Sequence, residues 1–155
     1  YNYRVTDFQC ALGISQLKKL PQWIIRRNEI AGQYDRFFKR VHGIEPLSKH
    51  STGTHAYHLY VVRVDEAALG INREHVFQGL QAAGIGVNVH YIPVYWHPLY
   101  KDRFEYAKGL CPKAEAAYEQ ILSLPLFPAM TDSDIARVCD SITALIPQQT
   151  SSEVQ

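Results

Sequence analysis

YHLYVVRV, residues 57–64, is the stretch that decides the fold. It is rich in β-branched and aromatic residues, and apolar side chains occupy both of its alternating faces. This composition predicts a strand in the interior of a sheet. The chain has 155 residues, of which 46% are apolar, so the sheet can belong to one domain with a sizeable core.

The sequence on both sides of this strand predicts further elements. These are short strands at 86–91 (GVNVHY) and 122–127 (LSLPLF) and helices at 72–84, 114–121 and 131–147. Asn72 and Thr131 are typical N-cap residues, and Pro125 places LSLPLF at an edge of the sheet. The fold class is therefore α/β, with about three strands covered by helices.

Two long helices are predicted ahead of the sheet. Thr6 and Gln9 form a capping box that starts the first helix, which runs to about Leu20. Pro21 suits the first turn of a second, amphipathic helix that ends near Gly43. The first helix is apolar nearly all round, which indicates either a central core helix or a helix covered by another domain or subunit. The pattern leaves both open.

These boundaries predict three parts. Residues 1–45 are two linker helices, residues 46–147 are a small α/β domain, and residues 148–155 are a disordered tail.

Charge and composition exclude several classes of function. The net charge of +1 gives no general attraction to nucleic acid or to a membrane surface, and no apolar run is long enough to span a bilayer. Three cysteines without a CxxC pair favour reduced thiols in the cytoplasm. His55 and His58 would point to opposite faces of a strand, so no metal site is predicted.

Two clusters of residues could bind a ligand. The first, Tyr1 to Arg4 (YNYR), combines the donor types that hold phosphate or sugar oxygens ahead of a helix. The second, HYIPVYWHP at 90–98, combines rings and prolines that could stack against a sugar or a base. Residue types alone favour a plainer interpretation of each: a segment without a special role, and an aromatic mini-core beneath a loop.

A resemblance changes this balance. YNYRVTDFQCALGISQLKKL (residues 1–20) resembles the GYNYRxTDxQAALGxxQLxxL segment of the DegT-type sugar aminotransferases, which are fold type I pyridoxal phosphate (PLP) enzymes. The similarity continues through RRNEIAGQYD, HLYVVRV, GIGVNVHYIPVYWHPLY and ILSLPLFPAMTDSDIARV. HYIPVYWHPLY and CPKAEAAYEQILSLPLFP are most similar to the pseudaminic-acid branch of the family. The resemblance implies the small C-terminal domain of such an enzyme, with two leading linker helices.

The resemblance also implies roles for residues. Asn2 would reach across a homodimer to the PLP phosphate of the other subunit, and Arg4 would flank that site. Further residues would contact the nucleotide-sugar substrate: Tyr1, His90, Tyr91, Ile92, Pro93 and Tyr95.

The lysine that forms the Schiff base with PLP has no counterpart in this sequence, because the family places it before the NYR motif. We therefore expect the chain to be the back part of a larger enzyme, inactive alone. The parent would use glutamate to aminate C4 of a UDP-linked 4-keto-6-deoxy-N-acetylhexosamine. The alternative is a stand-alone, non-catalytic domain that binds a nucleotide sugar or a protein. A longer reading frame upstream that contains the lysine would separate the two.

Overall fold

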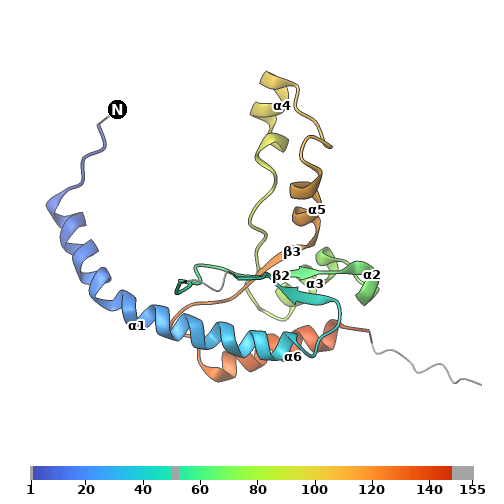
Figure 1. The fold of residues 1–155 in the computed structure, drawn as a ribbon, viewed down its shortest axis with the longest axis horizontal. Coiled ribbons are helices and arrows are strands. Elements are labelled where there is room, and N and C mark those ends of the chain that lie inside the picture. Colours follow the sequence, from blue (N-terminus) through green and yellow to red (C-terminus); the bar gives the residue numbers. More distant parts are fainter. Residues whose placement is uncertain (1, 50–52, 148–155) are drawn as a thin grey trace, which may run out of the picture.

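The computed structural model describes residues 2–49 and 53–147, so Tyr1 and the predicted tail at 148–155 lie outside the described residues. Figure 1 shows the arrangement of the elements. The helices and strands are α1 (Asp7–Phe38), β1 (Ile44–Pro46), β2 (Tyr60–Val64), α2 (Glu66–Leu69), α3 (Arg73–Ala82), the 3-10 helix η1 (Val94–Trp96), α4 (Pro98–Phe104), α5 (Pro112–Gln120), β3 (Ile121–Leu124) and α6 (Asp132–Leu145).

The sheet has three antiparallel strands in the order β1-β2-β3. The strand predicted at 57–64 is β2, and its central position confirms the prediction for Tyr60–Val64, whereas residues 57–59 lie before the strand. The stretch 86–91 was predicted as a strand, and this is wrong: only Asn88 pairs there, through an isolated bridge to Ser123. The amide of Val89 donates to the Asn88 side chain at 2.8 Å, so it does not extend a ladder. The three-residue strand β1 completes the sheet instead.

The two predicted leading helices are one continuous helix, α1, with Pro21 inside it. Pro21 lacks the N–H that would bond to the Leu17 carbonyl. Both residues lie in an exposed part of the helix, where water can take the place of the missing donor. The predicted capping box is confirmed, because Gln9 N–H donates to Thr6 Oγ1 while the Gln9 side chain accepts from Thr6 N–H.

The second half of α1 builds the core. It runs beside α6 below the sheet in Figure 1, and Ile30 and Tyr34 are fully buried there. The Tyr34 hydroxyl donates to the Pro125 carbonyl at 3.0 Å, and Arg27 donates to the Tyr57 carbonyl at 2.6 Å. α1 is therefore tied to the segment between β1 and β2 and to the segment after β3.

The first half of α1 has no such cover. Its apolar residues are exposed, including Phe8 at 80%, Leu12 at 53% and Leu17 at 64%. Figure 1 shows this half extending away from the rest of the chain. Of the two interpretations that the sequence left open, a core helix is therefore excluded within residues 2–49 and 53–147.

Gly43 and Gly70 allow a matched test of the packing at the turn after α1. Both have positive φ, +80° and +71°, but a Cβ at Gly43 would lie 2.7 Å from Leu69 Cγ, whereas a Cβ at Gly70 would meet nothing within 4 Å. We expect Gly70→Ala to lower the free energy of unfolding by about 1–2 kcal/mol through backbone strain alone. Gly43→Ala should cost about 1–3 kcal/mol more, because Leu69 must move. Equal losses in urea unfolding would contradict this packing.

Candidate functional site

The segment from residue 90 to 95, here called the 90–95 segment, crosses from the sheet to a projecting arm. It follows the Asn88 bridge to β3, and η1, α4 and α5 then stand away from the sheet (Figure 1). Tyr91 is 71% exposed and Ile92 37% exposed, while Pro93 is buried. The His90–Tyr91 peptide bond is cis. The segment thus presents an aromatic and an aliphatic side chain outward.

The His90 side chain is fixed by a contact with β3. Its Nδ1 lies 2.8 Å from the hydroxyl of Ser123 on β3, and its ring meets that of Tyr91 edge-on, with centroids 4.6 Å apart. Asn88 and Ser123 exchange two backbone hydrogen bonds, of 2.8 and 3.2 Å. The position of the His90 ring relative to the sheet is therefore fixed.

Tyr95 is engaged within the arm. Its hydroxyl donates to Glu115 at 2.5 Å, and the same carboxylate accepts two bonds from the Gly109 amide, at 2.8 and 2.9 Å. Desolvation, together with the nearby carboxylate, raises the pKa of Tyr95 to about 12. The hydrogen bond from Tyr95 is the main cause that lowers the pKa of Glu115. The resemblance implies a substrate contact for Tyr95, and in this structure its hydroxyl donates to Glu115 on α5.

The pKa shifts of Glu115 and Tyr95 predict how the hydrogen bonds between Tyr95, Glu115 and Gly109 depend on pH. Since the pKa of Glu115 lies below its ordinary value of 4.5, its bonds should hold above that value and break as the pH falls through the lowered pKa. Since the pKa of Tyr95 is raised, the stability that its hydrogen bond to Glu115 provides should be fully present below pH 10. It should be lost as the pH rises through about 12. We expect the Gly109 amide resonance to titrate in acid with a midpoint below 4.5. Glu115→Gln should abolish this transition, and a transition that survives the substitution would refute the assignment.

The N-terminal segment, residues 2–6, places Asn2, Tyr3 and Arg4 on the surface ahead of α1. The capping box uses the amides of Thr6 and Gln9. The Asn2 amide and the Arg4 guanidinium are further donors at this end, and both suit a phosphate. Figure 1 shows this segment far from the arm and the 90–95 segment. Within one chain, the two predicted clusters are not brought together.

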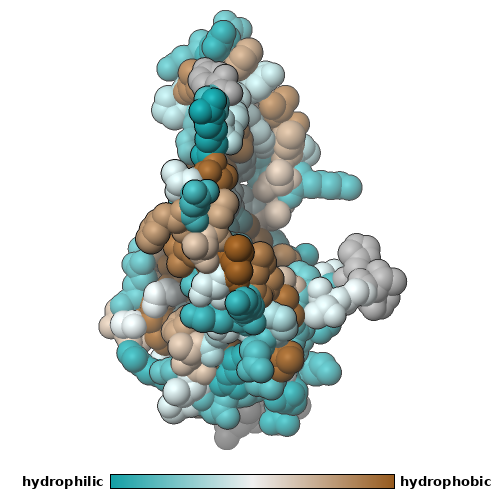
Figure 2. All heavy atoms as spheres, turned by 90° about the vertical axis from the view of Figure 1, so that its left-hand side faces the viewer, coloured by the Kyte–Doolittle hydropathy of each residue, from teal (hydrophilic) through white to brown (hydrophobic). Residues whose placement is uncertain are grey.

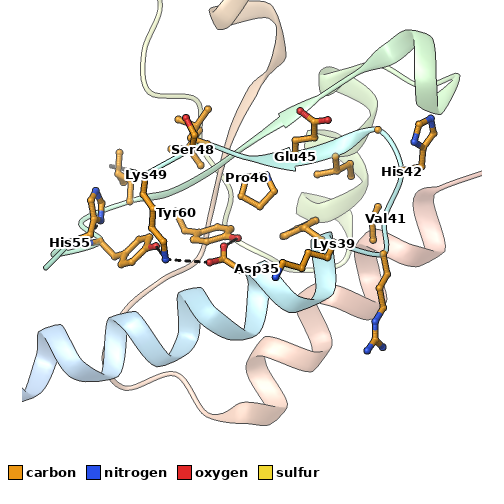
Figure 3. A pocket seen from close by; sticks show the side chains of 18 of the residues that line it. Asp35, Lys39, Val41, His42, Glu45, Pro46, Ser48, Lys49, His55 and Tyr60 are labelled. Carbon is orange, nitrogen blue, oxygen red and sulfur yellow. Dashed lines mark hydrogen bonds and ion pairs between the residues drawn. The ribbon is translucent and has the colours of Figure 1, made fainter. Parts of the chain in front are cut away.

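A separate cavity of about 1090 Å³ lies between the end of α1, β1 and the segment before β2. Figure 3 shows Lys49 and Tyr60 pointing at Asp35 inside it. The Tyr60 hydroxyl donates to Asp35 at 2.7 Å, and Lys49 Nζ lies 3.7 Å from the same carboxylate. None of the residues that the sequence assigns to a site lines this cavity.

Exposed apolar side chains lie on the side of the molecule formed by the first half of α1 and the segment before it. Figure 2 turns this face to the viewer, and brown hydrophobic residues lie near its middle. The exposed apolar residues of the first half of α1 and the segment before it are Tyr3, Val5, Phe8, Leu12, Ile14, Leu17 and Leu20. A group of exposed apolar side chains on one helix is typical of a surface that contacts another protein.

Residues 2–49 and 53–147 contain neither a cluster of metal-binding side chains nor a helix that could span a membrane. In these ranges no group of three or more His, Cys, Asp or Glu side chains could hold a metal ion. No helix within the same ranges combines the length and the apolar character needed to cross a membrane.

Comparison with known proteins decides the family. The model of the DegT/DnrJ/EryC1/StrS aminotransferase family matches residues 1–143. The chain belongs to this family. It is 40% identical to the spore coat polysaccharide biosynthesis protein SpsC of Bacillus subtilis over 147 residues, which are 94% of this chain and 38% of SpsC. It therefore spans less than two fifths of the length of such a relative.

Solved structures of the family share the fold. Helicobacter pylori PseC, an aminotransferase involved in the biosynthesis of pseudoaminic acid, is 30% identical with a TM-score of 0.84, over 94% of this chain and 38% of PseC. Streptococcus pneumoniae Spr1654 in its PLP form is 32% identical with a TM-score of 0.82, over 92% of this chain and 36% of that protein. The small α/β domain thus matches the C-terminal part of fold type I aminotransferases, as the sequence predicts, and homologues in the family bind PLP or its amino form.

The described residues fit one end of PLP. Asn2 and Arg4 are exposed donors that suit its phosphate. A lysine that forms an imine is typically desolvated or placed beside another cation, whereas every lysine in the described ranges is exposed. Lys49 is engaged by Asp35 and Tyr57, and Lys108 lies 4.5 Å from the Trp96 ring centroid. None of the described lysines therefore has the desolvated environment that is typical of a lysine that forms an imine.

The sequence missed two residues that the structure brings to the site. Ser123 lies 33 positions from His90 and Glu115 lies 20 positions from Tyr95, so no local pattern links either pair. One signal was present for Ser123: it is the only polar side chain in the apolar stretch LSLPLF.

Proposed function

We propose that this chain is the small-domain part of a PLP-dependent aminotransferase that moves the amino group of glutamate to C4 of a UDP-linked 4-keto-6-deoxy-N-acetylhexosamine. The observation that carries the proposal is the match to PseC along 94% of the chain at a TM-score of 0.84. The substrate is inferred from the pseudaminic-acid branch of the family, to which HYIPVYWHPLY is most similar.

Asn2 and Arg4 serve the phosphate of the cofactor in this proposal, and Tyr1 beside them in the sequence contacts the substrate. The exposure of Asn2 and Arg4 ahead of α1 supports this role, while Tyr1 lies outside the described residues. The remaining predicted contacts line the nucleotide-sugar pocket: His90, Tyr91, Ile92, Pro93 and Tyr95. The exposed Tyr91 and the fixed ring of His90 are suited to stack against and hydrogen-bond a sugar or a base.

A homodimer is part of the proposal. Two observations support it: the uncovered apolar face of α1 and the separation of the N-terminal segment from the 90–95 segment within one chain (Figure 1). Asn2 then serves the active site of the other subunit. The 90–95 segment of the same chain lines the sugar pocket of a different active site from the one that Asn2 reaches.

PLP, when bound, supplies the electron sink that amino transfer requires. In this proposal, the residues of this chain bind the cofactor and orient the substrate. Asn2 and Arg4 hold the phosphate end, and the 90–95 segment orients the sugar toward the reacting group. In this proposal, the lysine that the cofactor needs is not one of the described residues of this chain.

The test compares this chain with the longer protein. The 155-residue chain mixed with PLP should give no visible-band adduct that borohydride fixes to a single lysine. The longer protein should give one, and with glutamate it should aminate the UDP-linked keto sugar in preference to a dTDP-linked one. A specific reduced adduct on one lysine of this chain would overturn the division of roles. Preference for the dTDP sugar would overturn the substrate.

A further inference from the structure

Ser123 is a buried polar residue in an otherwise apolar strand. It is 5% exposed, and because side chains alternate along β3 it faces away from Leu122 and Leu124, whose side chains fill the core. On that opposite face its hydroxyl lies 2.8 Å from His90 Nδ1. The Asn88 bridge, with its two backbone hydrogen bonds, fixes the spacing between the two segments.

The buried hydroxyl determines which nitrogen of His90 carries the proton. A buried donor left without an acceptor costs about 1–3 kcal/mol, and His90 Nδ1 is the acceptor that the described residues place beside Ser123 Oγ. If the hydroxyl donates, Nδ1 carries no hydrogen, and the neutral ring is protonated at Nε2. The opposite tautomer would make the serine an acceptor and leave its hydrogen buried without a partner.

We infer that Ser123 is a positioning residue that fixes neutral His90 as the Nε2–H tautomer, so that His90 offers a hydrogen-bond donor to an acceptor oxygen of the ligand. The donor suits a carbonyl, hydroxyl or phosphate oxygen and rejects a ligand group that can only donate. Nε2 in this tautomer has no free lone pair, so it does not remove a proton from a substrate. Only the identity of the ligand, a nucleotide sugar, rests on the proposed function.

The tautomer can be measured on the 155-residue chain without any ligand. Long-range ¹⁵N–¹H spectra distinguish protonated from unprotonated imidazole nitrogens, and His90→Gln identifies the His90 signals. At a pH where the ring is neutral, we expect an unprotonated Nδ1 and a protonated Nε2. Ser123→Ala should shift Nδ1 toward the resonance of an unprotonated nitrogen without a donor, and Ser123→Thr should restore the original position.

Ser141→Ala is the matched control, since Ser141 is half-buried on α6 and its loss should leave the His90 signals unchanged. A protonated Nδ1 in the unmodified chain would overturn the inference. So would an unchanged Nδ1 resonance in a folded Ser123→Ala chain. If Ser123→Ala does not fold, the spectrum of the unmodified chain decides alone, because it reports the tautomer directly. Either result is independent of whether His90 meets a sugar, so failure of this inference and failure of the proposed function are distinguishable.

Discussion

Asn2→Ala in the longer protein is expected to weaken PLP binding about ten- to a hundredfold. The substitution removes a donor to the phosphate, and a hydrogen bond to a charged group is worth about 1.5–3 kcal/mol, which corresponds to roughly one to two decades in affinity. The fold should not change, because Asn2 is exposed and precedes the capping box of Thr6 and Gln9.

Two measurements check this prediction. Titration of the apo protein with PLP gives the affinity, and the unfolding temperature without PLP should stay the same. Gln16→Ala, which removes another exposed amide from α1, is the matched control and should not affect PLP. An unchanged affinity in Asn2→Ala, or a loss of apo stability large enough to explain weaker binding, would contradict the role of Asn2.

The 155-residue chain is expected to self-associate through the first half of α1 and to bind a hydrophobic dye there. Covering one exposed leucine is worth about 1.5–3 kcal/mol, so replacing both Leu12 and Leu17 with Gln should weaken association roughly a hundredfold or more. Gln retains the helix propensity of the segment, so the helix itself should remain.

Analytical ultracentrifugation at several concentrations, with dye fluorescence in parallel, measures this effect. Leu47→Gln is the control, because Leu47 is 52% exposed but lies outside α1. A dye-negative monomer of the unmodified chain would show that the apolar surface of α1 needs no cover. Equal effects of Leu47→Gln and the double substitution would show that α1 is not the contact.

Local signals in the sequence predicted the fold best. The caps at Thr6, Asn72 and Thr131 are confirmed, because an N-cap depends only on residues two or three positions away. The strand at 57–64 was recognised from its own composition. β1 was missed because three residues carry no periodicity and form a strand only by pairing with β2. Pro21 was misread because the choice between starting a helix and lying inside one depends on whether the helix before it continues.

The candidate site was predictable only in part. The resemblance to the family indicated the 90–95 segment, and the structure places Tyr91 and Ile92 of this segment on the surface. Two hydrogen-bond partners fix the segment: Ser123 contacts His90, and Glu115 accepts from Tyr95. Both partners belong to other elements, so these contacts depend on tertiary packing. The proposed contact of Asn2 with a second chain would involve atoms outside a single chain, so local sequence patterns cannot predict it.

Mixed dimers of the longer protein test most directly the central claim that each active site is shared between two subunits. One subunit carries Asn2→Ala, and the other lacks the PLP lysine but keeps Asn2. The remaining lysine then lies in the Asn2→Ala subunit and should receive an intact Asn2 from its partner, so PLP should bind there with normal affinity. Binding as weak as that of the dimer with Asn2→Ala in both subunits would show that Asn2 acts within its own subunit and would contradict the shared site.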